Sequence, residues 1–460
     1  MELNPEIFRE YDIRGIVNKD LTLNIVEVLG KAMGTYFQRH QKKEVALGRD
    51  CRLSSPAFAE ALTKGLLSTG CRVIDLGVIP TPLLYFSIYH KKFESGVMIT
   101  GSHNPPDHNG FKLMDGEETL YGETIKEIYR IIKSNEIMKG EGGSKKSYNI
   151  GPEYQDFLLG NIKLEKCLNV VIDAGNGTGG VVASPIFKKL GCLVQELYCE
   201  MDGNFPHHHP DPTLPEAMQD LIKKVRETKA DLGIGYDGDA DRIGVVDDQG
   251  RILWGDELMI IFSRDILPCH PGAPIISEVK ASKLLYAEIE RLGGRPIMWK
   301  TGHSLLKKKI KEEKAPLAGE MSGHIFFADR FFGFDDAIYA SARLLEILSR
   351  SRLKLSEMMA DLPQTYRTPE IRIYASDEVK FKIVDEVRRA LAKEHRIIDI
   401  DGVRAIYPKG WGLLRASNTQ AVLVLRFEAD TPEDLEAIRT DMKEKLEQAI
   451  KRLGTSGCQS

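Results

Sequence analysis

The sequence has no long apolar run, and its cysteines are few and scattered. No apolar stretch approaches the ~20 residues that a membrane-spanning helix needs, and the first residues show no basic start followed by an apolar stretch. We therefore expect no membrane association and no signal peptide. The seven cysteines are odd in number and no two stand at CxxC spacing, which argues against a disulfide framework and a zinc site. These absences predict a protein of the cytoplasm.

An excess of basic charge is also missing. The chain has 63 Lys and Arg residues against 67 Asp and Glu residues, so its formal net charge is -4. A surface that binds nucleic acid is normally basic, and we therefore expect no nucleic-acid partner. The mildly acidic balance still allows a locally basic cleft that would steer an anionic substrate.

The length of 460 residues is too great for one ordinary core and predicts several domains. Three segments share a pattern in which an apolar strand, a polar turn and a helix lead to a second strand that begins after glycine. They cover residues 45–75, 170–194 and 275–298. Strand, helix and strand in close succession are typical of α/β units. The pattern predicts three related α/β domains with mixed sheets, and a chance likeness is the alternative because identities are few.

Linker-like segments divide the chain. Residues 139–146 are rich in glycine and lysine and are expected to form a flexible surface connection. Residues 362–369 interrupt the helical pattern, and the chain after them is predicted to form strand, helix, three strands and a last helix, a smaller α+β domain. The expected domains are residues 1–148, 149–249, 250–364 and 365–460.

The strongest local pattern is Asp237-Gly238-Asp239-Ala240-Asp241-Arg242, between two apolar runs. Alternate residues of an extended loop point the same way, so three carboxylates can converge on one hard cation. A calcium EF-hand is excluded because Arg242 stands where that loop needs glycine. Few carboxylates and an open position favour Mg²⁺, which shares its coordination shell with phosphate oxygens. A solvated acidic turn is the alternative.

The second pattern is Thr100-Gly101-Ser102-His103-Asn104-Pro105, directly after a strand-like segment. No GxSxG elbow surrounds Ser102, which argues against an acyl-transfer nucleophile. A phosphate on Ser102 would carry about two negative charges, and a cation held by the aspartate loop would neutralise them. A serine in a turn of this composition can also be an ordinary turn residue.

The third pattern, Gly319-Glu320-Met321-Ser322-Gly323-His324, brings a carboxylate, a hydroxyl and an imidazole into six residues. Such a compact set of donors and acceptors suits the vicinal hydroxyls of a sugar. A polar loop ahead of an apolar segment is the structural alternative.

The fourth pattern, Arg415-Ala416-Ser417-Asn418-Thr419, lies between two predicted strands of the last domain. One guanidinium, two hydroxyls, an amide and the backbone N–H groups of a turn are suited to hold a phosphate dianion. An ordinary strand turn is again the alternative.

Several single cations could support this chemistry, although each also fits an ordinary surface charge. They are Arg14, Lys112, Arg242, Lys280 and His303. The triplet at residues 207–209 consists of three histidines and has the composition of a metal site. Adjacent residues of an extended segment point in opposite directions, so we interpret the triplet as structural.

In this order, the four loops resemble those of the α-D-phosphohexomutase superfamily, specifically the bacterial phosphomannomutase/phosphoglucomutase group. The resemblance runs through nearly the whole chain, from Tyr11-Asp12-Ile13-Arg14-Gly15 to the Arg415 loop, and the joint pattern is highly specific. It implies four domains arranged around a central active-site cleft, each of which contributes one loop.

The resemblance also implies roles for individual residues. The phosphoserine would be Ser102, and Mg²⁺ would be held by Ser102, Asp237, Asp239 and Asp241. The candidates for proton transfer and charge stabilisation would be Arg14, Lys112, Lys280, His303 and His324. The sugar phosphate would be bound by Tyr11, Arg242, Lys280, Glu320, Ser322, His324, Arg415, Ser417, Asn418 and Thr419.

The implied reaction interconverts the 1-phosphate and 6-phosphate of a hexose, mannose or glucose. Phospho-Ser102 would give its phosphoryl group to a free hydroxyl, and the 1,6-bisphosphosugar formed would turn over within the cleft and return its other phosphate. Reorientation without loss requires a cleft that closes, so we expect the last domain to hinge near residues 362–369. The expected partners are hexose phosphates, and we expect a monomer.

Three alternative functions remain at this point. A phosphoglucosamine mutase would use the same loops, although Met321 favours glucose and mannose phosphates by resemblance. A catalytically silent sugar-phosphate-binding protein would have no need of a phosphorylatable Ser102 beside three aspartates and Lys112. A metal-dependent serine phosphatase would release the phosphate of its phosphoenzyme to water.

Overall fold

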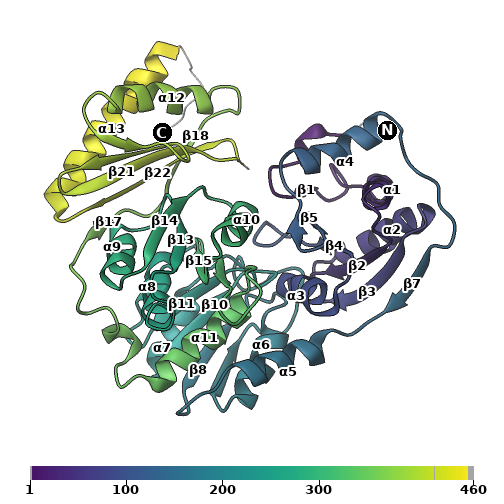
Figure 1. Cartoon of the computed structure of the whole chain (residues 1–460), viewed down its shortest axis with the longest axis horizontal. Coiled ribbons are helices and arrows are strands. Elements are labelled where there is room, and N and C mark those ends of the chain that lie inside the picture. The colour runs from purple at the N-terminus through teal and green to yellow at the C-terminus, as the bar shows by residue number, and fades with distance from the viewer. Residues whose placement is uncertain (1–2, 419, 454–460) are drawn as a thin grey trace.

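The computed structural model describes residues 3–418 and 420–453, whose strands form four sheets. In Figure 1 the four domains follow one another around an arc, with the N-terminal domain at one end and the C-terminal domain at the other. Among the described residues, no helix combines the length and apolar character that crossing a bilayer requires.

The first sheet has the strand order β1-β5-β4-β2-β3-β7, with the short β6 paired to β5. Its strands are β1 (Ile13–Ile16), β2 (Glu44–Arg49), β3 (Arg72–Val78), β4 (Ser95–Ile99), β5 (His108–Asp115), β6 (Glu118–Thr119) and β7 (Ser144–Ser147). The helices around it are η1 (Pro5–Ile7), α1 (Leu23–Arg39), α2 (Ser55–Ser68), α3 (Thr81–Lys91) and α4 (Glu123–Lys133).

The prediction of a flexible connection at residues 139–146 is wrong for its last residues, because they belong to strand β7 of the sheet. Strand β7 pairs in parallel with β3, from Ser144 opposite Arg72 to Ser147 opposite Asp75. All four of its residues are exposed. An edge strand with both faces in solvent needs no apolar alternation, so periodicity could not reveal it.

The second sheet has the order β12-β11-β10-β8-β9. Its strands are β8 (Asn169–Asp173), β9 (Leu193–Leu197), β10 (Leu232–Tyr236), β11 (Ile243–Asp247) and β12 (Ile252–Leu253). The helices of this part are α5 (Gly151–Asn161), α6 (Gly180–Lys189) and α7 (Gln219–Thr228).

The third sheet has the order β14-β13-β15-β16. Its strands are β13 (Pro274–Glu278), β14 (Arg295–Trp299), β15 (Leu317–Gly319) and β16 (Ile325–Phe327). The helices of this part are α8 (Gly255–Ile266), α9 (Lys283–Arg291), α10 (His303–Glu313), α11 (Ala337–Arg350) and η2 (Leu355–Glu357).

These three sheets share one arrangement of four strands, β5-β4-β2-β3, β11-β10-β8-β9 and β16-β15-β13-β14. In each, the first pair is antiparallel and the other two pairs are parallel. The common order confirms the expectation of three related α/β domains with mixed sheets.

The C-terminal domain is α+β, as predicted, with the strand order β17-β22-β21-β20-β19 and β18 also paired to β22. Its strands are β17 (Tyr366–Arg367), β18 (Ile371–Tyr374), β19 (Arg396–Ile398), β20 (Val403–Tyr407), β21 (Gly410–Ala416) and β22 (Val422–Ala429). The helices are α12 (Lys380–Leu391) and α13 (Pro432–Leu453). Four strands, not the predicted three, separate the two helices, because β19 is too short to show a period.

One continuous apolar core joins the first three domains, and it includes Met98 of β4, Ile234 of β10 and Phe327 of β16. The fourth domain has a core of its own beneath α13. A small apolar cluster of Val279, Trp411 and Leu413 connects the third domain to the fourth. The first three domains are therefore packed as one body, and the fourth is attached to it.

The last helix is capped at its first turn and packs one face on the core of the fourth domain. The backbone N–H of Asp434 donates to Oγ1 of Thr431 at 3.1 Å, which caps the first turn. The buried face of α13 consists of Ile438, Met442, Leu446 and Ala449.

Replacing Met442 by alanine in this helix should lower the free energy of unfolding by about 2–5 kcal/mol, because it leaves a cavity in the core of the fourth domain. Glu447→Ala, at an exposed position of the same helix, should change it by less than about 0.5 kcal/mol. Urea denaturation followed by circular dichroism measures both. Equal effects of the two substitutions would contradict this packing.

Candidate active site

The three sequence loops occupy the same position in their sheets. Each follows a central parallel strand and precedes its antiparallel neighbour: the Ser102 loop joins β4 to β5, the aspartate loop β10 to β11 and the Glu320 loop β15 to β16. The carboxyl ends of parallel strands are where α/β sheets place their ligand sites. The Arg415 loop is the turn between β21 and β22 of the fourth domain.

The Ser102 side chain meets the aspartate loop across the first two domains. Its Oγ donates a hydrogen bond of 2.6 Å to Oδ2 of Asp237, 135 residues away. Nδ1 of His103 lies 3.2 Å from the same Oγ. Ser102 is 3% exposed and has a backbone φ of 47°, the left-handed region that a non-glycine residue rarely adopts. The nucleophile candidate is thus held in one direction.

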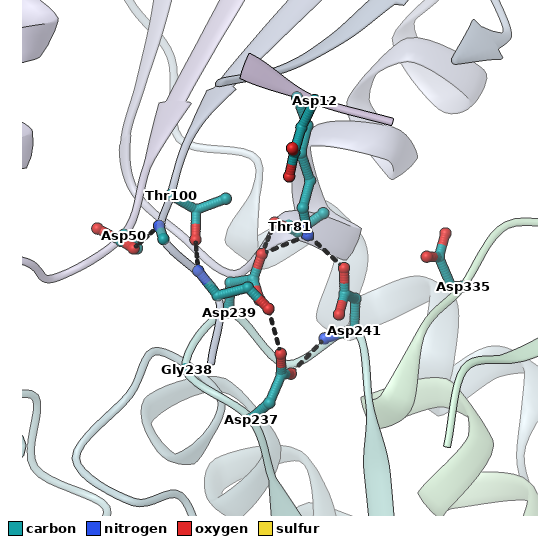
Figure 2. Close-up of polar contacts among 12 residues, drawn as sticks. Asp12, Asp50, Thr81, Thr100, Asp237, Gly238, Asp239, Asp241 and Asp335 are labelled. Atoms are coloured by element: carbon teal, nitrogen blue, oxygen red, sulfur yellow. Dashed lines mark hydrogen bonds and ion pairs between the residues drawn. The ribbon is translucent and has the colours of Figure 1, made fainter. Parts of the chain in front are cut away.

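The three aspartates form a buried cluster, as Figure 2 shows with the carboxylates of Asp237, Asp239 and Asp241 turned toward one another. One oxygen from each lies within 4.8 Å of the others. Oδ1 of Asp239 and Oδ1 of Asp241 are buried and make no hydrogen bond within the described chain. Buried carboxylate oxygens without partners fit a hard divalent cation. We therefore assign this loop as the candidate metal site.

Lys112 offsets part of this negative charge. Its ammonium Nζ lies 2.7 Å from Oδ2 of Asp239 and also contacts Asp241. Burial alone would lower the pKa of Lys112, but these carboxylates raise it well above its ordinary value. Burial and the neighbouring carboxylates raise the pKa of Asp237 well above its usual range. The hydroxyl of Thr81, at the start of α3, donates to Asp239 at 2.6 Å, a contact that the sequence did not predict.

A second polar centre is built around Asp335, which sequence reasoning missed. Nζ of Lys307 lies 2.9 Å from Oδ1 of Asp335. On Oδ2 of the same carboxylate, Nδ1 of His324 approaches to 3.2 Å and Nδ1 of His303 to 3.5 Å. Burial and the Lys307 charge lower the pKa of His303 well below its ordinary value. Both predicted histidines therefore share one buried carboxylate.

Arg242 links this centre to the aspartate loop. Its Nε donates to Nε2 of His324 at 3.0 Å, so Nδ1 is the protonated nitrogen of a neutral His324 ring. Nδ1 also lies 3.7 Å from Oδ1 of Asp241.

Glu320 accepts hydrogen bonds from its own loop and from the segment that precedes α10. Oε1 of Glu320 accepts from the backbone N–H of Gly302 at 2.6 Å. The hydroxyl of Ser322 donates to the other oxygen of Glu320 at 3.0 Å. Just before Gly302, the carbonyl of Thr301 accepts from the Tyr11 hydroxyl at 2.9 Å, which brings the first domain to this loop.

Lys280 lies at the junction of the third and fourth domains. Its Nζ lies 2.5 Å from Oε1 of Glu370. Burial alone would raise the pKa of Glu370, but the Lys280 ammonium lowers it to about 2. Arg426 donates to the carbonyl of Lys280 at 2.5 Å, and Arg404 donates to the flanking carbonyls of Val279 and Ala281. The backbone that carries Lys280 is thus held by side chains of the fourth domain.

In the phosphate-loop candidate, Nε of Arg415 lies 3.0 Å from Oδ2 of Asp401. The Asn418 amide donates to the Tyr11 hydroxyl at 3.3 Å, a contact between the fourth and first domains. The hydroxyl of Ser417 accepts from the backbone of Gln420. Thr419, the last predicted member, lies outside the described residues.

The remaining predicted cation, Arg14, lies beside the Ser102 loop. It donates 2.6 Å to Asp12 and 2.8 Å to the side chain of Asn104. In the histidine triplet, His207 bonds the side chain of Asn176 and His208 that of Asp173. Among the described residues, the groups of three ligands close enough for one ion do not include the triplet.

Four family models match consecutive parts of the chain. Three are described as phosphoglucomutase/phosphomannomutase, alpha/beta/alpha domains I, II and III, at residues 5–138, 152–250 and 254–366. The fourth is the phosphoglucomutase/phosphomannomutase C-terminal domain, at residues 370–445. The four models follow the order of the four sheets.

Individual proteins agree with the models. A Pseudomonas aeruginosa protein named phosphomannomutase/phosphoglucomutase is 49% identical over 445 residues, 96% of each chain. A Neisseria gonorrhoeae phosphoglucomutase is 46% identical over 97% of each chain. The crystal structure of a phosphoglucomutase/phosphomannomutase family protein from Burkholderia thailandensis has a TM-score of 0.92 at 41% identity, over 97% of this chain and 98% of that one. The chain belongs to the phosphoglucomutase/phosphomannomutase family, within the α-D-phosphohexomutase superfamily.

Replacing Lys112 by methionine should make the fold depend on a divalent cation. The substitution leaves two buried carboxylates without their ammonium partner, which should cost about 3–5 kcal/mol in a metal-free buffer. Added MgCl₂ or MnCl₂ should raise the melting temperature of the variant more than that of the wild type. Lys126→Met, an exposed lysine paired with Glu123, is the matched control. The same response to the metal in all three proteins would contradict the assigned site.

Proposed function

We propose that this chain is a phosphohexomutase that interconverts hexose 1-phosphate and hexose 6-phosphate, with glucose and mannose phosphates as substrates. The observation that carries the proposal is the 2.6 Å contact of the Ser102 hydroxyl with the metal-site candidate Asp237. A serine held there can store a phosphoryl group next to a cation and face a sugar. Relatives named phosphomannomutase/phosphoglucomutase across 96% of the chain support the same activity.

In the proposed reaction, phospho-Ser102 transfers its phosphoryl group to the free hydroxyl of a bound hexose phosphate. The Ser102 Oγ–P bond breaks as the sugar O–P bond forms, and the hydroxyl proton goes to the base. The 1,6-bisphosphosugar then turns over and returns its other phosphate to Ser102 by the reverse steps. The bound bisphosphosugar is therefore the intermediate. Free bisphosphosugar would transfer a phosphoryl group to Ser102 of an unphosphorylated enzyme and so activate it.

We assign Mg²⁺ to the aspartate cluster, where Asp237, Asp239 and Asp241 would hold it together with the Ser102 phosphate. When bound, Mg²⁺ neutralises charge on the transferring phosphoryl group. Lys112 and Arg14 supply further positive charge beside Ser102. Because transfer of a phosphoryl group needs little covalent help from the protein, such positioning and charge supply most of the rate.

His324 is the base that the geometry supports best. Its Nε2 carries a lone pair, because it accepts from Arg242, while Asp335 faces Nδ1 and stabilises the imidazolium that forms. A substrate hydroxyl would replace Arg242 at Nε2, which frees the guanidinium for a phosphate oxygen. His303, on the same carboxylate, would support the charge balance of the pair.

The remaining loops would bind the parts of the substrate that lie away from the transferred phosphoryl group. Glu320 and Ser322 would read sugar hydroxyls, since each offers hydrogen-bonding atoms in a preformed loop. Phosphate at the non-reacting end would be held by Arg415, Ser417, Asn418 and Thr419 of the fourth domain. Tyr11 and Lys280 would contact the substrate from the first and third domains. These loops would line one cleft between the domains expected at residues 1–148, 149–249, 250–364 and 365–460. We further propose a cytoplasmic monomer without a nucleic-acid partner.

Replacing Ser102 by alanine should reduce turnover of glucose 1-phosphate and mannose 1-phosphate by roughly a thousandfold or more, because the phosphoryl store is lost. Coupled assays for each 6-phosphate product measure the rate. Ser134→Ala, an exposed serine of the same domain, should retain full activity. Comparable turnover in the Ser102 variant would refute the relay. Phosphate release that keeps pace with isomerisation would instead support a phosphatase, and turnover of glucosamine phosphate alone a glucosamine-specific mutase.

We also propose that the fourth domain closes over the bound substrate by bending near residues 362–369. Its separate core supports this motion. Small-angle X-ray scattering should record a smaller radius of gyration when glucose 1-phosphate is added to the Ser102→Ala variant, which cannot turn it over. Glucose without phosphate is the control ligand and should leave the curve unchanged. An unchanged curve at saturating glucose 1-phosphate would contradict closure.

A further inference from the structure

We propose that Arg52 is a positioning residue that holds the Ser102 loop in the conformation required for phosphoryl transfer, an inference that rests on the proposed function. Its Nη2 donates to the carbonyls of Ser102 at 2.8 Å and Asn104 at 2.6 Å. Its Nη1 donates to the carbonyls of Pro105 at 2.5 Å and His108 at 3.0 Å. One guanidinium therefore binds three backbone carbonyls of the loop and one at the start of β5.

Asp50 secures the other polar groups at the start of the loop. Its Oδ2 accepts from the backbone N–H of Gly101 at 3.1 Å and lies 3.2 Å from Nε of Arg52. Its Oδ1 accepts from the Arg52 backbone and from the Ser55 hydroxyl. The side chains of Arg52 and Asp50 are 0% and 2% exposed. Asp50 thus binds a backbone N–H group of the loop while Arg52 binds its carbonyls. Together they clamp the loop through its backbone, and we call the pair the clamp.

The clamp is needed because the loop conformation is unfavourable by itself. The φ of 47° at Ser102 is a left-handed value, which a non-glycine residue keeps only when its surroundings impose it. In that conformation Oγ reaches Asp237. Without the guanidinium, the buried Ser102 carbonyl and three part-buried carbonyls would lose a donor, and the loop would rearrange to recover hydrogen bonds. A rearranged loop would redirect the serine.

The second domain encloses the same clamp. The Phe205 ring lies over the guanidinium, 5.0 Å from its carbon to the ring centroid. A Cβ on Gly203 would meet the Cys51 carbonyl at 2.5 Å, and one on Gly238 would meet the Ser102 carbonyl at 2.5 Å. The aspartate loop and Arg52 thus pack closely against the Ser102 backbone from two domains. A displaced Arg52 side chain would therefore find no free space beside it, and the Ser102 backbone would have to move.

A lysine could replace the charge of Arg52 but not its geometry. Two nitrogens of one planar fork donate to the four carbonyls while the third faces Asp50, whereas an ammonium is a compact point charge with three donors. Charge alone would therefore leave carbonyls of the loop unpaired. Comparing lysine with methionine at this position separates the two contributions.

The test compares Arg52→Lys and Arg52→Met with the wild type in the full-length enzyme. Because a shift of the reacting group by about 1 Å can cost about a hundredfold in rate, we expect kcat to fall by about that factor in both variants. KM for glucose 1-phosphate should change by less than about threefold, since the proposed phosphate grip is in the fourth domain. Mass spectrometry should show slower phosphorylation of Ser102 by glucose 1,6-bisphosphate.

A second variant keeps Arg52 but displaces it. A Cβ on Gly101 would meet Nε and Cζ of Arg52 at 2.4 and 2.5 Å, so Gly101→Ala should cause the same loss of kcat. Gly96→Ala, whose Cβ would meet side-chain ends of Ile88 and Leu84 at 3.3 Å, is its control in β4. Arg343→Met removes another buried arginine, paired with Asp329, and should lower stability without lowering kcat.

The readouts separate the possible failures. An inactive wild type would refute the proposed function and not the clamp, for which the phosphorylation rate of Ser102 remains the measure. The clamp would be overturned if the wild type is active and the Arg52 and Gly101 variants keep kcat and the rate of Ser102 phosphorylation within about twofold of the wild-type values. The clamp would also be overturned if each variant loses total activity only in proportion to its loss of folded protein, which is the result expected for Arg343→Met. Slow phosphorylation in well-folded variants, beside an active Gly96→Ala enzyme, would support it.

Discussion

The structure depends on keeping three carboxylates buried beside a serine that is proposed to carry two more negative charges. Like charges in a dry region repel strongly, so the Asp237 loop is stable only with cations close to it. Lys112 supplies one from the first domain, and the unpaired oxygens of the loop leave room for a metal. The same requirement brings the first two domains together, because the negative loop and its lysine come from different sheets.

Repetition of one sheet explains how the loops meet. Each of the first three domains turns back from a central parallel strand to an antiparallel one, and each turn carries a different set of polar side chains. Since the three domains share one apolar core, their turns are held rigidly with respect to one another. The fourth domain has a separate core and approaches through Asn418 and Tyr11. The proposed chemistry and the proposed phosphate-binding loop thus lie in parts of the molecule that have separate cores.

Much of the polar interior serves to support rather than to react. Asp335 holds two histidines and a lysine, Arg52 holds backbone carbonyls, and Asp401 holds Arg415. In each case the supporting residue and the group it contacts belong to the same domain. Such buried and half-buried partners restrict the ring, the guanidinium or the loop to one orientation, which is what positioning requires.

The sequence by itself determined what is local: the three α/β repeats, the last helix and the four polar turns, because their signals lie within a few consecutive residues. It did not predict β7, whose exposed edge has no apolar period, or Asp335, Arg52 and Asp401, which are single charged residues without a local pattern. Only the tertiary structure decided which cation faces which carboxylate. Such pairs join residues as far apart as Lys112 and Asp241, and their energy comes from burial that no short segment contains.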